Sequence, residues 1–186
     1  VRIVPKENGA EIKYDVDKSE VLTHGGIPVF GLYPDDVNTV EVSYTRTDLT
    51  GEKKAVNEAY KIYAPPVYTE GNGTVSQKST MFDTTVVKAD PEFKDRLYLV
   101  NNLLVSPPKG SRVVWNNPSG GALEWCFYPQ NAIIDATGEV RWYMNVDSIY
   151  DMESVYNGGV MMGFQQGADG ALTWGFGQKY VKYDII

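Results

Sequence analysis

Apolar and polar residues alternate in three short stretches of the first third of the chain, at 12–16, 40–44 and 60–63. In such a period-2 pattern one set of side chains faces a core and the other faces water, as in half-buried antiparallel strands. Turn-forming pairs and triplets separate the stretches: Asn8-Gly9, Gly25-Gly26, Pro34-Asp35-Asp36, Thr50-Gly51 and Pro65-Pro66. This punctuation predicts an all-β N-terminal domain, an immunoglobulin-like β-sandwich.

The clearest single element lies in the last third, where residues 132–142 (AIIDATGEVRW) predict a strand, a tight turn and a second strand. Asp135 can accept a hydrogen bond from the backbone two residues on, and Gly138 can adopt the positive φ that a three-residue hairpin loop requires. Trp142 then brings a large apolar face, which we expect to pack inside the sheet.

Three further strand-length segments follow, at 159–165, 171–175 and 179–186, with glycine-containing turns between them. Asp184 stands 49 positions after Asp135 and looks like the start of a second Asp-led hairpin. A four-stranded propeller blade takes about 40–50 residues, so the spacing suggests about one blade. Two unrelated hairpins in a sandwich remain the alternative.

The middle of the chain is less regular. Residues 67–77 are polar and predict a loop, 84–88 predict a strand, and 106–121 predict a long irregular connection rich in Pro, Gly, Ser and Asn. We place a domain boundary where the Asp90-Pro91-Glu92 break precedes the next strand. The expected domains are a β-sandwich at 1–92 and a second unit at 93–186.

Composition and the rare reactive residues narrow the function classes. The formal net charge is −7 with no Lys/Arg cluster, which disfavours nucleic-acid binding. No run of 18 apolar residues exists, so no membrane span is expected. Cys126 is the single cysteine and is expected to pack as a small apolar residue. His24 is the single histidine; no ligand spacing surrounds it, and we expect a solvated turn residue and no metal site.

Five ordered segments resemble bacterial arylsulfate sulfotransferases. They are 26–33 (GIPVFGLY), 93–101 (FKDRLYLVN), 133–138 (IIDATG) with Arg141-Trp142-Tyr143, Met161-Met162-Gly163, and Lys182-Tyr183-Asp184. The resemblance implies an N-terminal β-sandwich followed by a six-bladed β-propeller. It also implies that the chain starts after the first strand or two of the sandwich and ends inside the early propeller.

The resemblance further implies transfer of a sulfuryl group from a phenolic sulfate ester to a phenolic acceptor, through a sulfated histidine and without a cofactor. None of the family's nucleophile and stabiliser motifs matches a segment here, and His24 corresponds to none of them. The catalytic histidine is therefore expected outside this chain, and the 186 residues alone are expected to be inactive. Membership of this family also implies an extracytoplasmic location, periplasmic or secreted.

One pocket residue is implied by the match of 121–125 (GALEW) to a family segment whose aromatic residue lines the aryl pocket. Trp125 is the matching position, and it would stack on the phenyl ring of a donor or acceptor. A Trp that packs sandwich against propeller is an equally good interpretation. Val160 stands where relatives carry an aromatic residue that helps to form this pocket, so the resemblance implies a difference in pocket shape or substrate preference.

Two other function classes stay open. A sandwich with a partial propeller can be a non-catalytic binding or dimerisation module of an extracytoplasmic protein. The Asp-led hairpin with its Trp also occurs in quinoprotein propellers, although residues 1–90 match the sulfotransferase sandwich instead. Unpaired strand edges of an open propeller predict self-association, so a homo-oligomer is expected.

Overall fold

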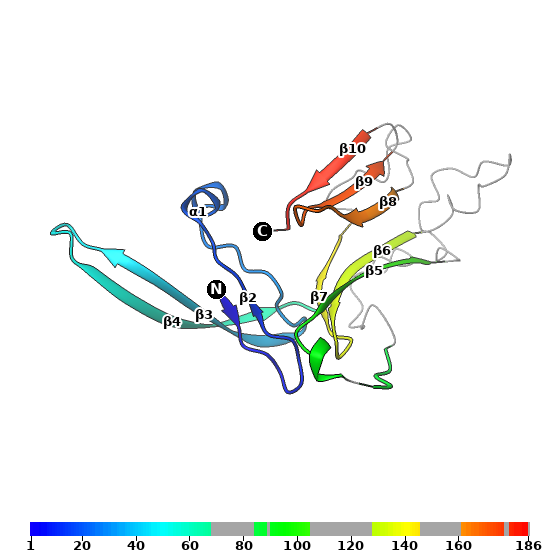
Figure 1. Ribbon diagram of the computed structural model, residues 1–186, viewed down its shortest axis with the longest axis horizontal. Helices are drawn as coiled ribbons and strands as arrows, with labels where there is room; N and C mark the ends of the chain where they lie inside the picture. Colours follow the sequence, from blue (N-terminus) through cyan, green and yellow to red (C-terminus); the bar gives the residue numbers. More distant parts are fainter. Residues whose placement is uncertain (68–83, 89, 105–127, 146–160, 177–178, 186) are drawn as a thin grey trace, which may run out of the picture.

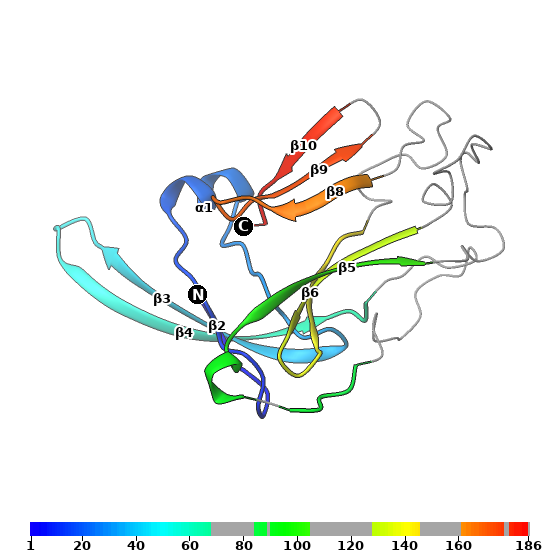
Figure 2. The ribbon, with the colours of Figure 1, turned by 45° about the vertical axis from the view of Figure 1, so that its right-hand side comes forward.

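The computed structural model describes residues 1–186 except 68–83, 89, 105–127, 146–160, 177–178 and 186. The described strands form three antiparallel sheets, accompanied by one short helix and one 3-10 turn (Figure 1). The N-terminal sheet and its long hairpin extend to one side, and the two later sheets lie together on the other (Figures 1 and 2).

The N-terminal sheet has the strand order β2-β1-β3-β4. Its strands are β1 (Arg2–Ile3), β2 (Ile12–Lys13), β3 (Asp36–Thr47) and β4 (Lys53–Ala64). A buried cluster lies on one face of this sheet and consists of Ile3, Ile12, Val40 and Val42. Phe30 and Leu32 pack against that cluster from the segment that precedes β3. The apolar positions at 12, 40 and 42 that alternate in the sequence therefore belong to this core.

The second and third sheets contain three described strands each. One has the order β5-β6-β7, with β5 at Leu97–Leu104, β6 at Tyr128–Asp135 and β7 at Val140–Tyr143. The other has the order β10-β9-β8, with β8 at Met161–Gln166, β9 at Leu172–Phe176 and β10 at Lys179–Tyr183.

A shared core joins these two sheets. Met144, Leu172 and Trp174 form its buried centre, and partly buried apolar side chains from both sheets pack against it: Leu99, Trp142, Phe164, Val181 and Ile185. The rings of Trp142 and Trp174 both lie near Tyr183, with centroid distances of 6.4 and 6.1 Å. Trp142 thus has the packing role expected from the sequence.

The same five-residue turn closes two hairpins of different sheets. Residues 48–52 (DLTGE) join β3 to β4, and residues 135–139 (DATGE) join β6 to β7. In each turn the first residue's N–H donates to the carbonyl of the fifth, and its carboxylate accepts from the third residue's N–H and hydroxyl and from the fifth residue's N–H. Both glycines have φ +87°. The predicted Asp-led hairpin at 135 is confirmed.

The two turn glycines offer a matched pair for mutation. A Cβ at Gly138 would lie 2.1 Å from Thr84 Oγ1 and 2.7 Å from Thr84 Cβ, whereas a Cβ at Gly51 meets nothing within 4 Å. Both alanine variants carry the strain of a positive φ, but only Gly138→Ala also overpacks a neighbour. We expect Gly138→Ala to lower the free energy of unfolding by about 1–3 kcal/mol more than Gly51→Ala, measured by urea denaturation. Equal losses would show that Thr84 does not pack on this turn.

The structure corrects the expectation for His24. Residues 18–24 form the helix α1 (Lys18–His24), so His24 ends a helix and does not sit in a turn. Asp17 and Glu20 make a reciprocal capping box at the start of this helix, and Gly25 ends it with φ 64°. The strand expected at 12–16 is correspondingly short, because β2 stops at Lys13.

One further expectation is wrong in the middle of the chain. Residues 84–88 do not form a strand, and a 3-10 turn at Pro91–Phe93 follows them. The described strands after residue 93 divide between two three-stranded sheets, and the suggestion of a propeller blade stays a prediction. The loop predicted at 106–121 lies outside the described residues, as does most of the one at 67–77.

Candidate functional site

The site residue predicted from the sequence, Trp125, lies outside the described residues, as do Cys126 and Val160. His24 is exposed at the end of α1. Within the described part of the chain, no group of three His, Cys, Asp or Glu side chains could hold a metal ion. The structure does bring together two of the family-like segments, residues 26–33 and the hairpin of β6 and β7.

Arg141 on β7 makes that contact. Its side chain has no exposed surface, and its Nη1 lies 3.0 Å from Oδ2 of Asp135, whose side chain is equally buried. Nη1 also donates to the carbonyl of Ala10 at 3.0 Å, and Nε donates to the carbonyl of Gly31 at 3.0 Å. The guanidinium therefore links the 135–139 turn to two loops of the N-terminal region.

Tyr33 completes this contact. Its hydroxyl accepts a hydrogen bond from Arg141 Nη1 at 3.1 Å, and the Arg141 guanidinium stacks over its ring at 3.8 Å. The backbone N–H of Lys6 also donates to this hydroxyl. Burial raises the pKa of Tyr33, although the hydrogen bond from Lys6 and the charge of Arg141 oppose the rise. The phenol thus stays neutral and serves as hydrogen-bond acceptor and stacking surface.

Lys6 forms an outer layer of charge around this buried group. Its Nζ lies 4.6 Å from the centre of the Tyr33 ring, 3.1 Å from Asp36 Oδ2 and 3.5 Å from Glu139 Oε1. Partial burial would lower the pKa of Lys6, but the two carboxylates outweigh it and the pKa is raised. The hydrogen bond from Lys6 in turn lowers the pKa of Asp36. Lys6 therefore adds a second link between the two regions, because Asp36 begins β3 and Glu139 ends the 135–139 turn.

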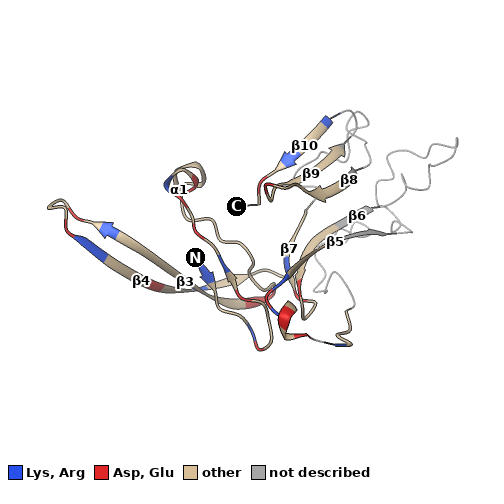
Figure 3. Cartoon of the chain, in the orientation of Figure 1, with Lys and Arg blue, Asp and Glu red and all other residues tan. Residues whose placement is uncertain are grey.

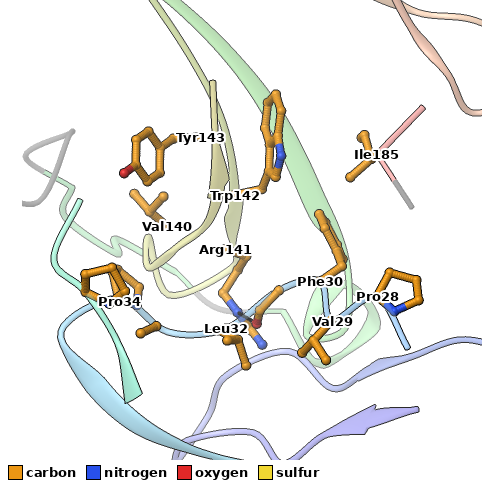
Figure 4. Close-up of a pocket in the computed structure, with 13 residues that line it drawn as sticks. Pro28, Val29, Phe30, Leu32, Pro34, Val140, Arg141, Trp142, Tyr143 and Ile185 are labelled. Carbon is orange, nitrogen blue, oxygen red and sulfur yellow. Dashed lines mark hydrogen bonds between the residues drawn. The ribbon is translucent and has the colours of Figure 1, made fainter. Parts of the chain in front are cut away.

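A hollow of about 330 Å³ lies beside this junction (Figure 4). One wall is the segment from Pro28 to Leu32, and the other is β7 with Trp142 and Tyr143. Figure 4 shows Arg141 reaching from β7 down to the 28–32 segment, with Trp142 and Tyr143 above it. Most of the lining is apolar or aromatic, and Ile185 closes one side.

The geometry of this site is that of a structural junction. The Arg141 side chain has no exposed surface, so its hydrogen bonds hold neighbouring parts of the chain together. Among the described residues that line the hollow there is no Ser, Cys, His, Lys or carboxylate that could act as nucleophile or general base. The arrangement can hold two parts of the fold together.

Sequence reasoning missed the role of Arg141. An arginine in a short strand is expected to point to solvent, and the alternation rule gives no reason to bury it. A usable signal existed in the repeated Asp-x-Thr-Gly-Glu pentapeptide, since only the copy at 135–139 is followed two positions later by an arginine; the first copy is followed by Lys54. The aspartate that closes the turn can also form an ion pair with that arginine, as Asp135 does with Arg141.

Comparison with known proteins finds two family models and two curated relatives that match the chain. The sequence model of the arylsulfotransferase family (ASST) matches residues 83–186, and the model of the arylsulfotransferase Ig-like domain matches residues 1–65. A curated arylsulfate sulfotransferase AssT of Lelliottia amnigena is 32% identical over 196 residues, which cover 97% of this chain and 31% of the relative. A second AssT, of Escherichia coli O6:H1 (strain CFT073), is 29% identical over the same shares of both chains.

The chain thus spans 31% of the length of these curated relatives. In the described part of the chain, no helix is both long enough and apolar enough to cross a membrane. The comparisons confirm the resemblance found in the sequence, and with it an all-β fold that begins with an Ig-like domain. The chain belongs to the arylsulfotransferase family.

Proposed function

We propose that this chain forms the Ig-like domain and the first part of the β-propeller of an enzyme that transfers a sulfuryl group between phenols. The donor is a phenolic sulfate ester and the acceptor is a phenol. The observation that carries the proposal is the consecutive match of two family models, at 1–65 and 83–186, in one chain. The names of the two curated relatives, both arylsulfate sulfotransferases, agree with it.

The proposed chemistry uses a histidine outside these 186 residues and no cofactor. An imidazole nitrogen attacks sulfur, the bond from sulfur to the aryl oxygen breaks, and the donor leaves as a phenolate, which takes up a proton from solvent to become a phenol. The acceptor phenol oxygen then attacks the same sulfur, loses its proton, and the bond from sulfur to nitrogen breaks. Neutral imidazole is a good nucleophile near neutral pH. His24 is a poor candidate for this role, because it is exposed at the end of α1 and corresponds to none of the family's nucleophile motifs.

The proposed division of the chain is 1–92 for the Ig-like domain and 93–186 for the beginning of a six-bladed propeller. Two features of the structure support it. The sheets β5-β6-β7 and β8-β9-β10 share one apolar core, as the packed sheets of a propeller do. Neither sheet pairs with a strand of the N-terminal sheet within the described residues. In this proposal Arg141 fixes the angle between the Ig-like domain and the start of the propeller.

The same proposal places the protein outside the cytoplasm, in the periplasm or secreted. Its support is the family assignment. The interacting molecules are therefore small phenols and their sulfate esters, with no role for nucleic acid.

The activity proposal predicts a difference between two chains of different length. The 186 residues alone are expected to release no p-nitrophenol from p-nitrophenyl sulfate in the presence of phenol. The same gene product extended to the length of its relatives is expected to turn over under identical conditions. Colorimetric release of p-nitrophenol measures both. Turnover by the 186 residues alone would locate the nucleophile within them, and an inactive extended protein that is folded would contradict the proposed function.

A second prediction concerns Trp125, which we propose lines the aryl pocket of the extended protein. Removing its indole in Trp125→Ala would take away a stacking surface worth about 0.5–1.5 kcal/mol, so kcat/KM for aryl sulfates should fall about twofold to thirteenfold. Trp142→Phe, a change inside the core of the later sheets, is the control for general loosening of the fold. Unchanged kinetics for Trp125→Ala would leave Trp125 as a packing residue.

A further inference from the structure

Helix α1 is capped at both ends, yet none of its seven residues is buried by the part of the chain that the structure describes. Asp17 and Glu20 make the capping box at its start. At its end Gly25 has φ 64° and the Gly26 N–H donates to the Val21 carbonyl, as in a Schellman motif. Helices this short are marginal in water by themselves and depend on a packed apolar face, so these caps indicate that α1 has a packing partner.

Large apolar side chains are exposed on this helix and on the segment that follows it. Leu22 is 72% exposed, Ile27 42% and Val29 36%. We call these three residues the outer strip. No Lys, Arg, Asp or Glu occurs from residue 21 to residue 34, so the strip lies on an uncharged stretch of the chain (Figure 3).

Tyr14 holds the segment that carries Val29. Its hydroxyl accepts a hydrogen bond from the Phe30 N–H at 2.7 Å and donates one to the Pro28 carbonyl at 3.0 Å. The Phe30 side chain packs against the N-terminal core. Exposure alternates along the segment, with Ile27 and Val29 exposed and Pro28 and Phe30 half-buried. The two exposed residues therefore face away from that core.

The outer strip adjoins the hollow beside Arg141. Val29 lines this hollow with Phe30 and Trp142, and Ile185 lines it as well (Figure 4). Ile185 also packs against the core of the later sheets. The apolar surface therefore extends from Val29 across the hollow to the later sheets. Apolar side chains scattered singly on a surface are ordinary, but a strip that adjoins an apolar hollow is the kind of patch that marks an interaction site.

The C-terminal end of the described chain lies at the same surface. Ile185 follows closely after β10, and Figures 1 and 2 both show this end of the chain beside α1. The chain spans 31% of the length of its curated relatives. In the proposed enzyme, the part of the propeller that follows residue 186 would therefore start next to the outer strip, which makes it the nearest segment able to cover α1.

We propose that the outer strip and the adjoining hollow are the surface on which the later part of the propeller packs against the Ig-like domain. The occupant is an apolar segment of the same polypeptide, from beyond residue 186. This inference rests on the proposed function only in that the propeller continues past these residues, and it does not involve the transfer chemistry. In it, α1 is a docking element and the Tyr14 hydroxyl positions the strip.

Photo-cross-linking identifies the occupant. In the protein extended to the length of its relatives, the photoreactive amino acid p-benzoylphenylalanine replaces Leu22 or Val29. Irradiation should link either position to a peptide from beyond residue 186 of the same molecule, identified by mass spectrometry. His24 is the control position, because it lies on the opposite side of the helix from Leu22, and it should give no such link. Links between two copies, or only to residues 1–186, overturn the proposal.

Alkylation rates measure how well the strip is covered. In the 186-residue chain, Leu22→Cys and His24→Cys should react with a maleimide at similar rates, since both positions are exposed. In the extended protein, Leu22→Cys should react at least about tenfold more slowly, because a packed segment must open before the thiol is reached. His24→Cys should keep its rate. Peptide mass spectrometry follows each thiol separately.

The outcome separates this inference from the proposed function. A folded extended protein that transfers sulfate but leaves Leu22→Cys as reactive as in the 186-residue chain overturns the packing and leaves the activity standing. A protein that protects Leu22→Cys but transfers no sulfate does the reverse. Protection that is lost at much lower protein concentration would come from a second copy and would also overturn the proposal.

Discussion

Replacing Arg141 with methionine is expected to lower the free energy of unfolding by about 3–5 kcal/mol. The change removes a fully buried guanidinium and leaves the Asp135 carboxylate buried without its partner. It also leaves the carbonyls of Ala10 and Gly31 without the donor they now have. Methionine fills a similar length, so the loss reflects unpaired polar groups more than a cavity. Urea denaturation followed by Trp fluorescence measures it.

Arg96 is the matched control. It too stacks on an aromatic ring, that of Phe93 at 4.2 Å, and it lies 3.9 Å from a carboxylate oxygen of Glu92. Its side chain is 59% exposed, so solvent screens both interactions. Arg96→Met should change the free energy of unfolding by less than about 1 kcal/mol. Similar losses for the two variants would show that burial of Arg141 does not matter.

Asp135→Asn is expected to lower the free energy of unfolding by about 3 kcal/mol or more, nearly as much as Arg141→Met. Asparagine keeps the oxygen that accepts from the N–H groups of Thr137 and Glu139, so the turn can still close. What it removes is the negative charge beside Arg141, which then remains buried and unpaired. Thermal and urea denaturation should both show the loss.

Asp48→Asn supplies the control, since Asp48 makes the same turn but is exposed to solvent and forms no ion pair with a described residue. Asp48→Asn should lower the free energy of unfolding much less than Asp135→Asn does. The double variant Asp135→Asn/Arg141→Met keeps neither charge of the buried pair. Its loss in the free energy of unfolding should therefore be well below the sum of the losses of the two single variants. Additive costs in this cycle would mean that the two side chains do not act as a pair.

The sequence predicted those elements whose cause is local. Strands β3 and β4 follow from alternation, whereas β6, β7 and the turn between them follow from an Asp and a Gly at fixed positions of a hairpin. The capping box at Asp17 and Glu20 was an equally local signal for α1, but the sequence prediction placed only a turn at Gly25-Gly26 and overlooked the helix before it. The resemblance of five segments to bacterial arylsulfate sulfotransferases indicated the family, which composition and residue spacing alone could not indicate.

What could not be predicted depends on contacts between distant parts of the chain. Arg141 lies 110 positions from Gly31 and 131 from Ala10, so no local pattern indicates that these groups meet. The grouping of the later strands into two sheets likewise depends on a core that draws from both, around Leu172 and Trp174. Burial of a charged residue is decided by such partners and not by its own strand pattern.

The junction explains how two sequence units are held together. The Ig-like model ends at residue 65 and the sulfotransferase model begins at 83, yet Arg141 and Tyr33 lie on opposite sides of that gap and share a hydrogen bond and a stacked contact. In the proposed enzyme this contact would hold the start of the propeller at a fixed angle to the domain that precedes it.

Hydrogen exchange of backbone amides in Arg141→Met tests this central claim most directly. The Phe30 amide donates to the Tyr14 hydroxyl and the Tyr33 amide donates to Asn38, so both report on the segment that Arg141 holds. Exchange at these two amides should become at least about tenfold faster in Arg141→Met, while Arg96→Met leaves it unchanged. Unchanged protection of Phe30 and Tyr33 in Arg141→Met would contradict the account, because the N-terminal segment would then keep its structure without the link to β7.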